Sequence, residues 1–126
     1  MFRHLAKSFW PGPLTIVVKA NTSLIDPIVT ANTSFVGIRL PNHELARSLI
    51  HAAGVPIAAP SANKFGHVSP TKASHVIYDF ERNNVLVLDG GQSGFGFEST
   101  VAKIEEQEDR LLIKILRRGG ISEDAM

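Results

Sequence analysis

Apolar and polar positions along this chain follow periods that predict helices and strands in mixed order. Before Trp10, apolar residues recur at helical spacing, and Pro11-Gly12-Pro13 ends that first helix. A second amphipathic helix is predicted from His43 to Ala53, closed by Gly54, and a third from about Thr71 to Arg82. The residues expected on the inner faces of these helices are Phe2, Leu5, Ala6, Phe9, Leu45, Ala46, Leu49, Ile50, Ala53, Ala73, Val76, Ile77 and Phe80.

Short apolar runs bounded by turn residues predict the strands. They are residues 14–18, 35–40, 55–59, 85–88, 99–104 and 111–116, with the first covered on both faces and 85–88 also buried. The charged segment 105–110 predicts a hairpin turn, so the last two strands are expected to be antiparallel. The predicted fold class is therefore α/β, a twisted mixed sheet with flanking helices, in one domain covering residues 1–126.

Composition narrows the class of protein. The chain is 44% hydrophobic and 20% charged, as in a soluble globular domain. Its net charge of +1 gives no global field for nucleic acid or an anionic membrane, although a local basic patch remains open. No apolar run approaches the roughly 18 residues of a membrane span, and the first residues lack the apolar core of a signal peptide. Because cysteine is absent, disulfides and thiol catalysis are excluded, and we expect a cytoplasmic protein.

The segment Ala59–Thr71 is the most informative candidate site. It joins a predicted strand to a predicted helix, which is where α/β proteins commonly place ligand-binding loops. Serine and asparagine side chains there offer neutral donors and acceptors, and Gly66 lets the backbone approach a ligand closely. The alternative is an ordinary turn followed by a helix N-cap, because the same residue types build turns.

Three further polar clusters stand at predicted strand ends: Arg39, Glu98-Ser99-Thr100, and Arg117-Arg118. Guanidinium groups among hydroxyls suggest an anionic ligand that carries carboxylate or phosphate groups. The alternatives are solvated or ion-paired arginines and turn hydroxyls satisfied within the protein.

Familiar catalytic templates fit this sequence poorly. Ser61 is not in a Gly-x-Ser-x-Gly elbow, and the glycines between Gly90 and Gly96 form neither a P-loop nor a dinucleotide fingerprint. The five histidines, none at metal-ligand spacing, are His4, His43, His51, His67 and His75. We therefore expect binding and positioning chemistry, with no covalent nucleophile and no metal held by the protein alone.

Five blocks of sequence carry a resemblance to a known family. They read FWPGPLT (9–15), VGIRLP (36–41), APSAN (59–63) with SPT (69–71), GFESTV (96–101) and ILRRGG (115–120). In this order they resemble the YrdC-like threonylcarbamoyl-AMP synthases over nearly the whole chain.

The resemblance implies an activity. Members of the family condense L-threonine, bicarbonate and ATP into L-threonylcarbamoyl-AMP and pyrophosphate, and the product serves N6-threonylcarbamoyladenosine modification of tRNA. The threonine carbamate attacks the α-phosphate, so the protein supplies proximity and electrostatics without a nucleophile. Mg²⁺ is implied as the cofactor that enters with ATP and bridges its phosphates.

The resemblance also implies site residues, position by position. The threonine-binding residues are Arg39, Ala59 through its backbone, and Ser99. The ATP-binding residues are Phe35 through its backbone, Ser61, Asn63, Ser69 and Arg117. Asn63 is expected either to brace its loop or to touch the ligand. Arg118 stands where the family often has proline, so which arginine of the pair reaches phosphate is open.

The chain departs from the family at its front, because nothing matches the Lys-Arg segment that binds phosphates and threonine. We expect the C-terminal two-thirds of a YrdC-like catalytic domain, its N-terminal part missing, weakly active or inactive alone. A strand edge left uncovered would favour a homodimer. Two alternatives stay open: a non-catalytic RNA-binding module of the same fold, and a YrdC-like module from a carbamoyltransferase. The near-neutral charge gives the first little support, and no flanking zinc-finger sequence supports the second.

Overall fold

Two compact units make up the part of the chain that the structure describes. The computed structural model describes residues 1–94, 98–108 and 110–126. The first unit joins Met1–Pro56 to Glu98–Met126, and the second is the described part of Ile57–Phe97. Gly96, Phe97 and Asp109, which belong to a family block and to the predicted hairpin turn, lie outside the described residues.

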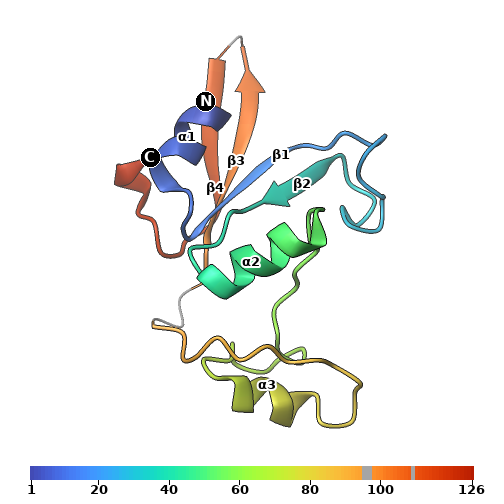
Figure 1. Ribbon diagram of the computed structural model, residues 1–126. Helices are drawn as coiled ribbons and strands as arrows, with labels where there is room; N and C mark the ends of the chain where they lie inside the picture. The colour runs from blue at the N-terminus through green and yellow to red at the C-terminus, as the bar shows by residue number, and fades with distance from the viewer. Residues whose placement is uncertain (95–97, 109) are drawn as a thin grey trace. The chain divides into compact units, whose positions relative to one another are not determined.

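A four-stranded mixed sheet organises the first unit (Figure 1). Its strands are β1 (Leu14–Lys19), β2 (Phe35–Ile38), β3 (Thr100–Gln107) and β4 (Arg110–Arg117), in the order β2-β1-β3-β4. The two central strands, β1 and β3, are parallel, and both outer pairs are antiparallel. The predicted α/β class and mixed sheet are confirmed, and so is the antiparallel hairpin of the last two strands.

The core of the first unit lies between the sheet and helix α1 (Phe2–Phe9). Leu5 is 1% exposed and packs with Leu14, Ile16 and Ala102, while Ile121 and Met126 close over the same core. The two chain ends therefore lie near each other, as Figure 1 shows, and the last turn is a short 3₁₀ helix, Glu123–Ala125. Alternate β1 side chains remain half-buried, so the prediction that β1 is covered on both faces is wrong for the described residues.

Helix α2 (Glu44–Ala53) confirms a predicted helix and its end. Gly54 follows it in the left-handed region, at φ 67°, and donates its N–H to the carbonyls of Ile50 and His51. The predicted burial of its apolar stripe is wrong, because the structure buries no residue of this helix among those described.

Two predicted strands are wrong. The segments 55–59 and 85–88 are irregular and largely exposed, with Leu86 88% exposed. A strand exists only when its backbone groups pair with another strand, and the described residues supply no partner to these segments. The third predicted helix forms as α3 (Ala73–Asp79), shorter than predicted and without a buried residue.

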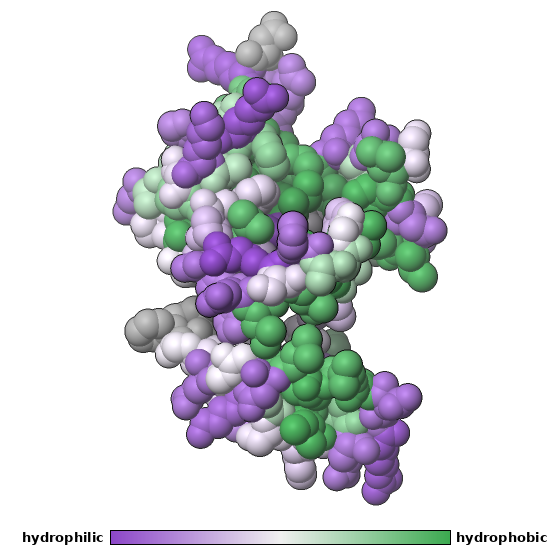
Figure 2. Space-filling model, in the orientation of Figure 1, coloured by the Kyte–Doolittle hydropathy of each residue, from purple (hydrophilic) through white to green (hydrophobic). Residues whose placement is uncertain are grey.

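The β3–β4 hairpin is longer than predicted. Residues 105–107, predicted as turn, pair with 110–112 as strand, and Glu108 has a positive φ of 48° beyond the end of β3. Many large apolar side chains stay at the surface of both units, where Figure 2 shows hydrophobic residues among charged ones. None of the helices in the described ranges is long and apolar enough to cross a membrane.

Candidate functional site

Ser99 and Arg117 meet at one end of the central strands. Pairing of Val101 with Arg117 brings the end of β4 beside the start of β3. The Arg117 Nη2 donates to Ser99 Oγ at 3.0 Å and to the Ser99 carbonyl at 2.9 Å, and Nε donates to that carbonyl at 3.1 Å. Ser99 is 5% exposed, and its hydroxyl lies 2.8 Å from Thr15 Oγ1 on β1. Two of the predicted site residues are therefore in direct contact.

Glu98 completes this cluster, which we call the Ser99–Arg117 cluster and define as Thr15, Glu98, Ser99 and Arg117. A carboxylate oxygen of Glu98 lies 2.6 Å from Arg117 Nη1, and both side chains are nearly half exposed. An anionic ligand that approached Nη1 would have to displace this carboxylate from the guanidinium. Sequence reasoning named the turn that holds Glu98 but missed the ion pair, and it missed Thr15. The one hydroxyl between the apolar residues of β1 was the available signal.

The backbone around Ser99 is fixed by close packing against Gly119. A Cβ on Gly119 would lie 2.4 Å from the Glu98 carbonyl oxygen, so only glycine permits this approach. The fully buried Thr100 donates its hydroxyl to the Ile121 carbonyl at 2.7 Å and accepts from the Ile121 N–H at 2.9 Å. The GG pair of the last sequence block thus holds the turn that presents Ser99.

Arg39 lies directly after β2 in the same unit and has its own anchor. Its Nε donates to the Gly12 carbonyl at 3.2 Å, and the Gly12 N–H donates to the Leu40 carbonyl at 2.9 Å. The PGP segment therefore sets the position of this guanidinium. Arg39 is exposed.

Phe35, at the start of β2, lies under a cation that sequence reasoning missed. The Lys103 Nζ is 3.8 Å from the centre of the Phe35 ring and 2.9 Å from a carboxylate oxygen of Glu105. The hydrogen bond from Lys103 lowers the pKa of Glu105 below its usual value, and the nearby lysine charges act in the same direction. A positive charge therefore stands over the aromatic ring of Phe35.

Asn63 braces its loop within the second unit. Its Nδ2 donates to the carbonyls of His67, at 2.8 Å, and Lys64, at 3.2 Å. The amide oxygen, Oδ1, is buried and has no hydrogen-bond partner among the described residues. Of the two uses expected for Asn63, the structure shows the bracing of the loop, through the amide nitrogen.

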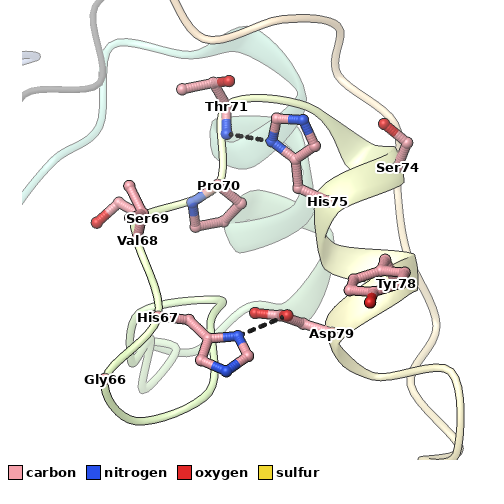
Figure 3. A pocket seen from close by; sticks show the side chains of 10 residues that line it. All are labelled: Gly66, His67, Val68, Ser69, Pro70, Thr71, Ser74, His75, Tyr78 and Asp79. Carbon is pink, nitrogen blue, oxygen red and sulfur yellow. Dashed lines mark hydrogen bonds and ion pairs between the residues drawn. The ribbon is translucent and has the colours of Figure 1, made fainter.

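The loop is tied to α3 through Asp79 (Figure 3). Asp79 Oδ1 lies 2.9 Å from His67 Nδ1, and Oδ2 accepts the Lys64 N–H at 3.2 Å. The His67 hydrogen bond lowers the pKa of Asp79 below its usual value; burial opposes this effect, and the Lys64 N–H adds to it. Sequence reasoning did not single out Asp79, because a carboxylate at the end of a short helix is usually solvated.

A cleft of about 530 Å³ lies between this loop and α3. It is lined by Gly66, His67, Val68, Ser69, Pro70, Thr71, Ser74, His75, Tyr78 and Asp79. Of the predicted site residues only Ser69 lines it, while Ala59 and Ser61 are exposed elsewhere on the second unit. No group of three His, Cys, Asp or Glu residues in the described ranges could hold a metal ion.

These features define a class of protein: an α/β domain with hydroxyl and guanidinium groups at its strand ends and in its loops. The family follows from direct comparison. The model of the Sua5/YciO/YrdC family, described as "Telomere recombination", matches residues 1–119, and the chain belongs to this family.

Curated relatives carry a common name. The chain is 44% identical over 122 residues to the threonylcarbamoyl-AMP synthase of Bacillus subtilis, covering 97% of this chain and 34% of the relative. It is 46% identical over 125 residues to that of Schizosaccharomyces pombe, covering 97% of this chain and 30% of the relative. The chain therefore spans about a third of the length of these relatives.

Solved structures confirm the fold. The crystal structure of Pyrococcus abyssi Sua5 complexed with L-threonine superposes with a TM-score of 0.86 at 42% identity, covering 94% of this chain and 34% of that one. A variant of the same Sua5, H234A/Y235A, superposes with a TM-score of 0.88 at 41% identity, covering 97% of this chain and 36% of the other.

Proposed function

We propose that this chain contributes the threonine- and ATP-binding part of an L-threonylcarbamoyladenylate synthase. Such an enzyme condenses L-threonine, bicarbonate and ATP to threonylcarbamoyl-AMP and pyrophosphate for N6-threonylcarbamoyladenosine in tRNA. The observation that carries the proposal is the buried Ser99 hydroxyl held by Arg117, in a chain 44% identical to a threonylcarbamoyl-AMP synthase. An ATP-dependent step of tRNA modification, in a chain without cysteine, fits the cytoplasm.

The threonine end of the proposed site uses three residues. Arg39 pairs with the carboxylate, because its guanidinium stands exposed at a strand end and fits two oxygens. The Ser99 hydroxyl bonds a polar group of the amino acid, and the backbone at Ala59 is the third group proposed to contact threonine. The P. abyssi relative solved with L-threonine supports this choice of ligand.

The ATP end uses Ser61, Asn63, Ser69, the backbone at Phe35 and the guanidinium of Arg117. A phosphate oxygen replaces the Glu98 carboxylate at Arg117 Nη1, while Nε and Nη2 remain bonded to Ser99. The Asn63 Oδ1 accepts a hydrogen bond from a donor group of the nucleotide. Mg²⁺ would enter with ATP, held by the nucleotide phosphates, and would supply positive charge to offset that of the leaving pyrophosphate.

The chemistry these residues perform is positioning and charge stabilisation. Threonine carbamate and the α-phosphate are both anionic, so guanidinium groups must hold them together against repulsion. Among the described residues, the proposed arginines supply the positive charge that holds the two anions together. None of the proposed residues serves as a nucleophile. Because the chain is about a third of its relatives' length, we expect weak or no turnover from it alone.

Isothermal titration of the chain with L-threonine, and separately with MgATP, tests the proposal. We expect Ser99→Ala to weaken threonine binding about tenfold, because a hydrogen bond to a charged ligand is lost. Ser93→Ala, on an exposed segment of the other unit, serves as the matched serine control and should leave threonine affinity unchanged. Absence of both affinities, or salt-dependent RNA binding that is indifferent to ATP, would contradict the proposal.

A further inference from the structure

One carboxylate in the second unit uses both of its oxygens on a single loop. Asp79 is the last residue of α3, and its side chain is 12% exposed. It accepts the backbone N–H of Lys64, fifteen positions earlier, and contacts the ring of His67, twelve positions earlier. The two bonds hold the loop at points three residues apart, and Figure 3 shows the one to His67.

The gripped segment is also closed on itself. The His67 N–H donates to the Lys64 carbonyl at 3.0 Å, and Gly66 between them has a φ of 83° that reverses the chain. The Asn63 side chain bonds the His67 carbonyl from the inside of the same turn. Residues 63–67 therefore form one braced turn. Asp79 is the side chain that fastens this turn to a helix within the described residues.

We propose that Asp79 is the positioning residue of the nucleotide-binding loop, an inference that rests on the proposed function for its link to ATP. Ser61 lies two residues before this turn and Ser69 two residues after it. Because the turn is rigid and anchored, it sets where the two serines stand relative to each other. Asp79 does not touch the nucleotide; it acts through the Lys64 amide and the His67 ring.

Three variants separate positioning from general stability. Asp79→Ala removes both anchors. Asp79→Asn keeps them, since its amide offers an oxygen to the Lys64 N–H and an N–H to a neutral His67 Nδ1. Glu81→Gln is the matched control, because this nearby carboxylate lies 4.0 Å from Arg82 on an exposed surface.

The first readout is hydrogen–deuterium exchange of the loop in the full chain. Asp79→Ala should raise exchange over residues 61–69 about tenfold, with the first unit unchanged, while Asp79→Asn and Glu81→Gln stay near the parent. Loop exchange that does not respond to Asp79→Ala, or that rises equally in Asp79→Asn, would overturn the inference.

The second readout is ligand affinity. Asp79→Ala should weaken MgATP binding about tenfold and leave L-threonine binding unchanged, because Arg39 and Ser99 belong to the other unit and Ala59 lies outside the turn that Asp79 anchors. An equal loss of both affinities would point to general unfolding of the Asp79→Ala variant, and a second variant then decides. In that event His67→Ala, which removes one anchor and leaves the Lys64 bond, must still loosen the loop for the inference to survive.

The two proposals fail separately. If the parent chain does not bind ATP but its loop responds to Asp79→Ala and is spared by Asp79→Asn, the anchor stands and the nucleotide site is wrong. If ATP binds equally to the parent and to Asp79→Ala despite a loosened loop, the proposed function stands and Asp79 is not its positioning residue.

Discussion

At the scale of the residue, two adjacent arginines differ sharply in their surroundings. Arg117 bonds Ser99 through Nε and Nη2 and has Glu98 at Nη1, while Arg118 is 86% exposed and bonds Glu123 at 2.7 Å. That bond to Glu123 raises the pKa of Arg118 above its already high value, so its charge is permanent. The structure therefore places Arg117, and not its neighbour, in the cluster that the proposed site requires.

Alanine substitution of each arginine in turn resolves which one reaches phosphate. Arg117→Ala should weaken MgATP binding by tenfold or more, since a charge-assisted contact to phosphate is lost. Arg118→Ala should change it less than about twofold, because an exposed pair contributes little. Equal losses in the two variants, measured by isothermal titration, would show that Arg117 is not the phosphate ligand.

Individual site residues could be predicted from the sequence only where a polar residue type stood out at a predicted strand end. Ser99 and Arg117 stood out as polar groups at predicted strand ends, and their contact follows from the pairing of β3 with β4. Glu98, Thr15 and Lys103 were not foreseeable to the same degree, because their roles depend on strand register. The role of Asp79 depends on how the loop at 63–67 folds back over α3, and the hydrophobic periodicity of the sequence does not specify that path.

At the scale of the element, the end of α2 offers a clean test of backbone strain. Gly54 has φ 67°, and a Cβ there would meet no atom within 4 Å. Gly54→Ala should therefore lower the free energy of unfolding by roughly 1–2 kcal/mol through left-handed strain alone. Gly94→Ala is the control, because Gly94 is equally open but has no positive φ. Urea unfolding should show a loss for the first and none for the second.

Acid should weaken two separate anchors in the fold. The pKa values of Asp79 and Glu105 are lowered, by His67 and Lys103 respectively, so both carboxylates bind protons more readily when unfolded. Each then stabilises the fold at pH above its unfolded pKa, about 4, and that contribution is lost as pH falls through the lower folded pKa.

The thermal midpoint measured from pH 6 to pH 2.5 should fall below about pH 4. The fall should be shallower in a chain carrying Asp79→Asn and Glu105→Gln, because neither side chain can then take up a proton. An unchanged slope in that double variant would rule out these carboxylates as the acid-sensitive anchors.

The elements that sequence predicted well are those that stabilise themselves locally. Helices α1 and α2 carry their own hydrogen bonds and their own stop signals, and both ended where proline and glycine indicated. Strands at 55–59 and 85–88 were predicted from apolar character alone, yet a strand needs a neighbour that no local pattern can guarantee. Burial of a helix face likewise needs a neighbouring element. The sequence predicted inward faces for α2 and α3, but no residue of either helix is buried among those described.

At the scale of the whole molecule, the outer edge of β4 is available for association. The strand runs for eight residues at the edge of the sheet, and Leu111, Leu112 and Leu116 are about half exposed. We expect the chain to form dimers through this edge, since unpaired strand backbone beside apolar side chains favours pairing with a second copy.

Light scattering coupled to size exclusion over a range of concentrations measures that association. Leu112→Lys should shift the chain toward monomer, because a charge on an edge strand discourages pairing. Leu24→Lys, at an exposed apolar position outside the sheet, is the control and should leave the distribution as it was. A monomer at every concentration in the parent would contradict edge pairing.

The parallel contact of β1 with β3 has a consequence for how the polypeptide is made. Thr15 and Ser99, which touch at the end of this pair, are 84 positions apart in the chain. During translation at roughly 5–20 residues per second, β1 must wait several seconds before the strand that completes its core leaves the ribosome. Nascent chains halted before residue 100 should accordingly bind chaperones, and release should coincide with emergence of the final hairpin.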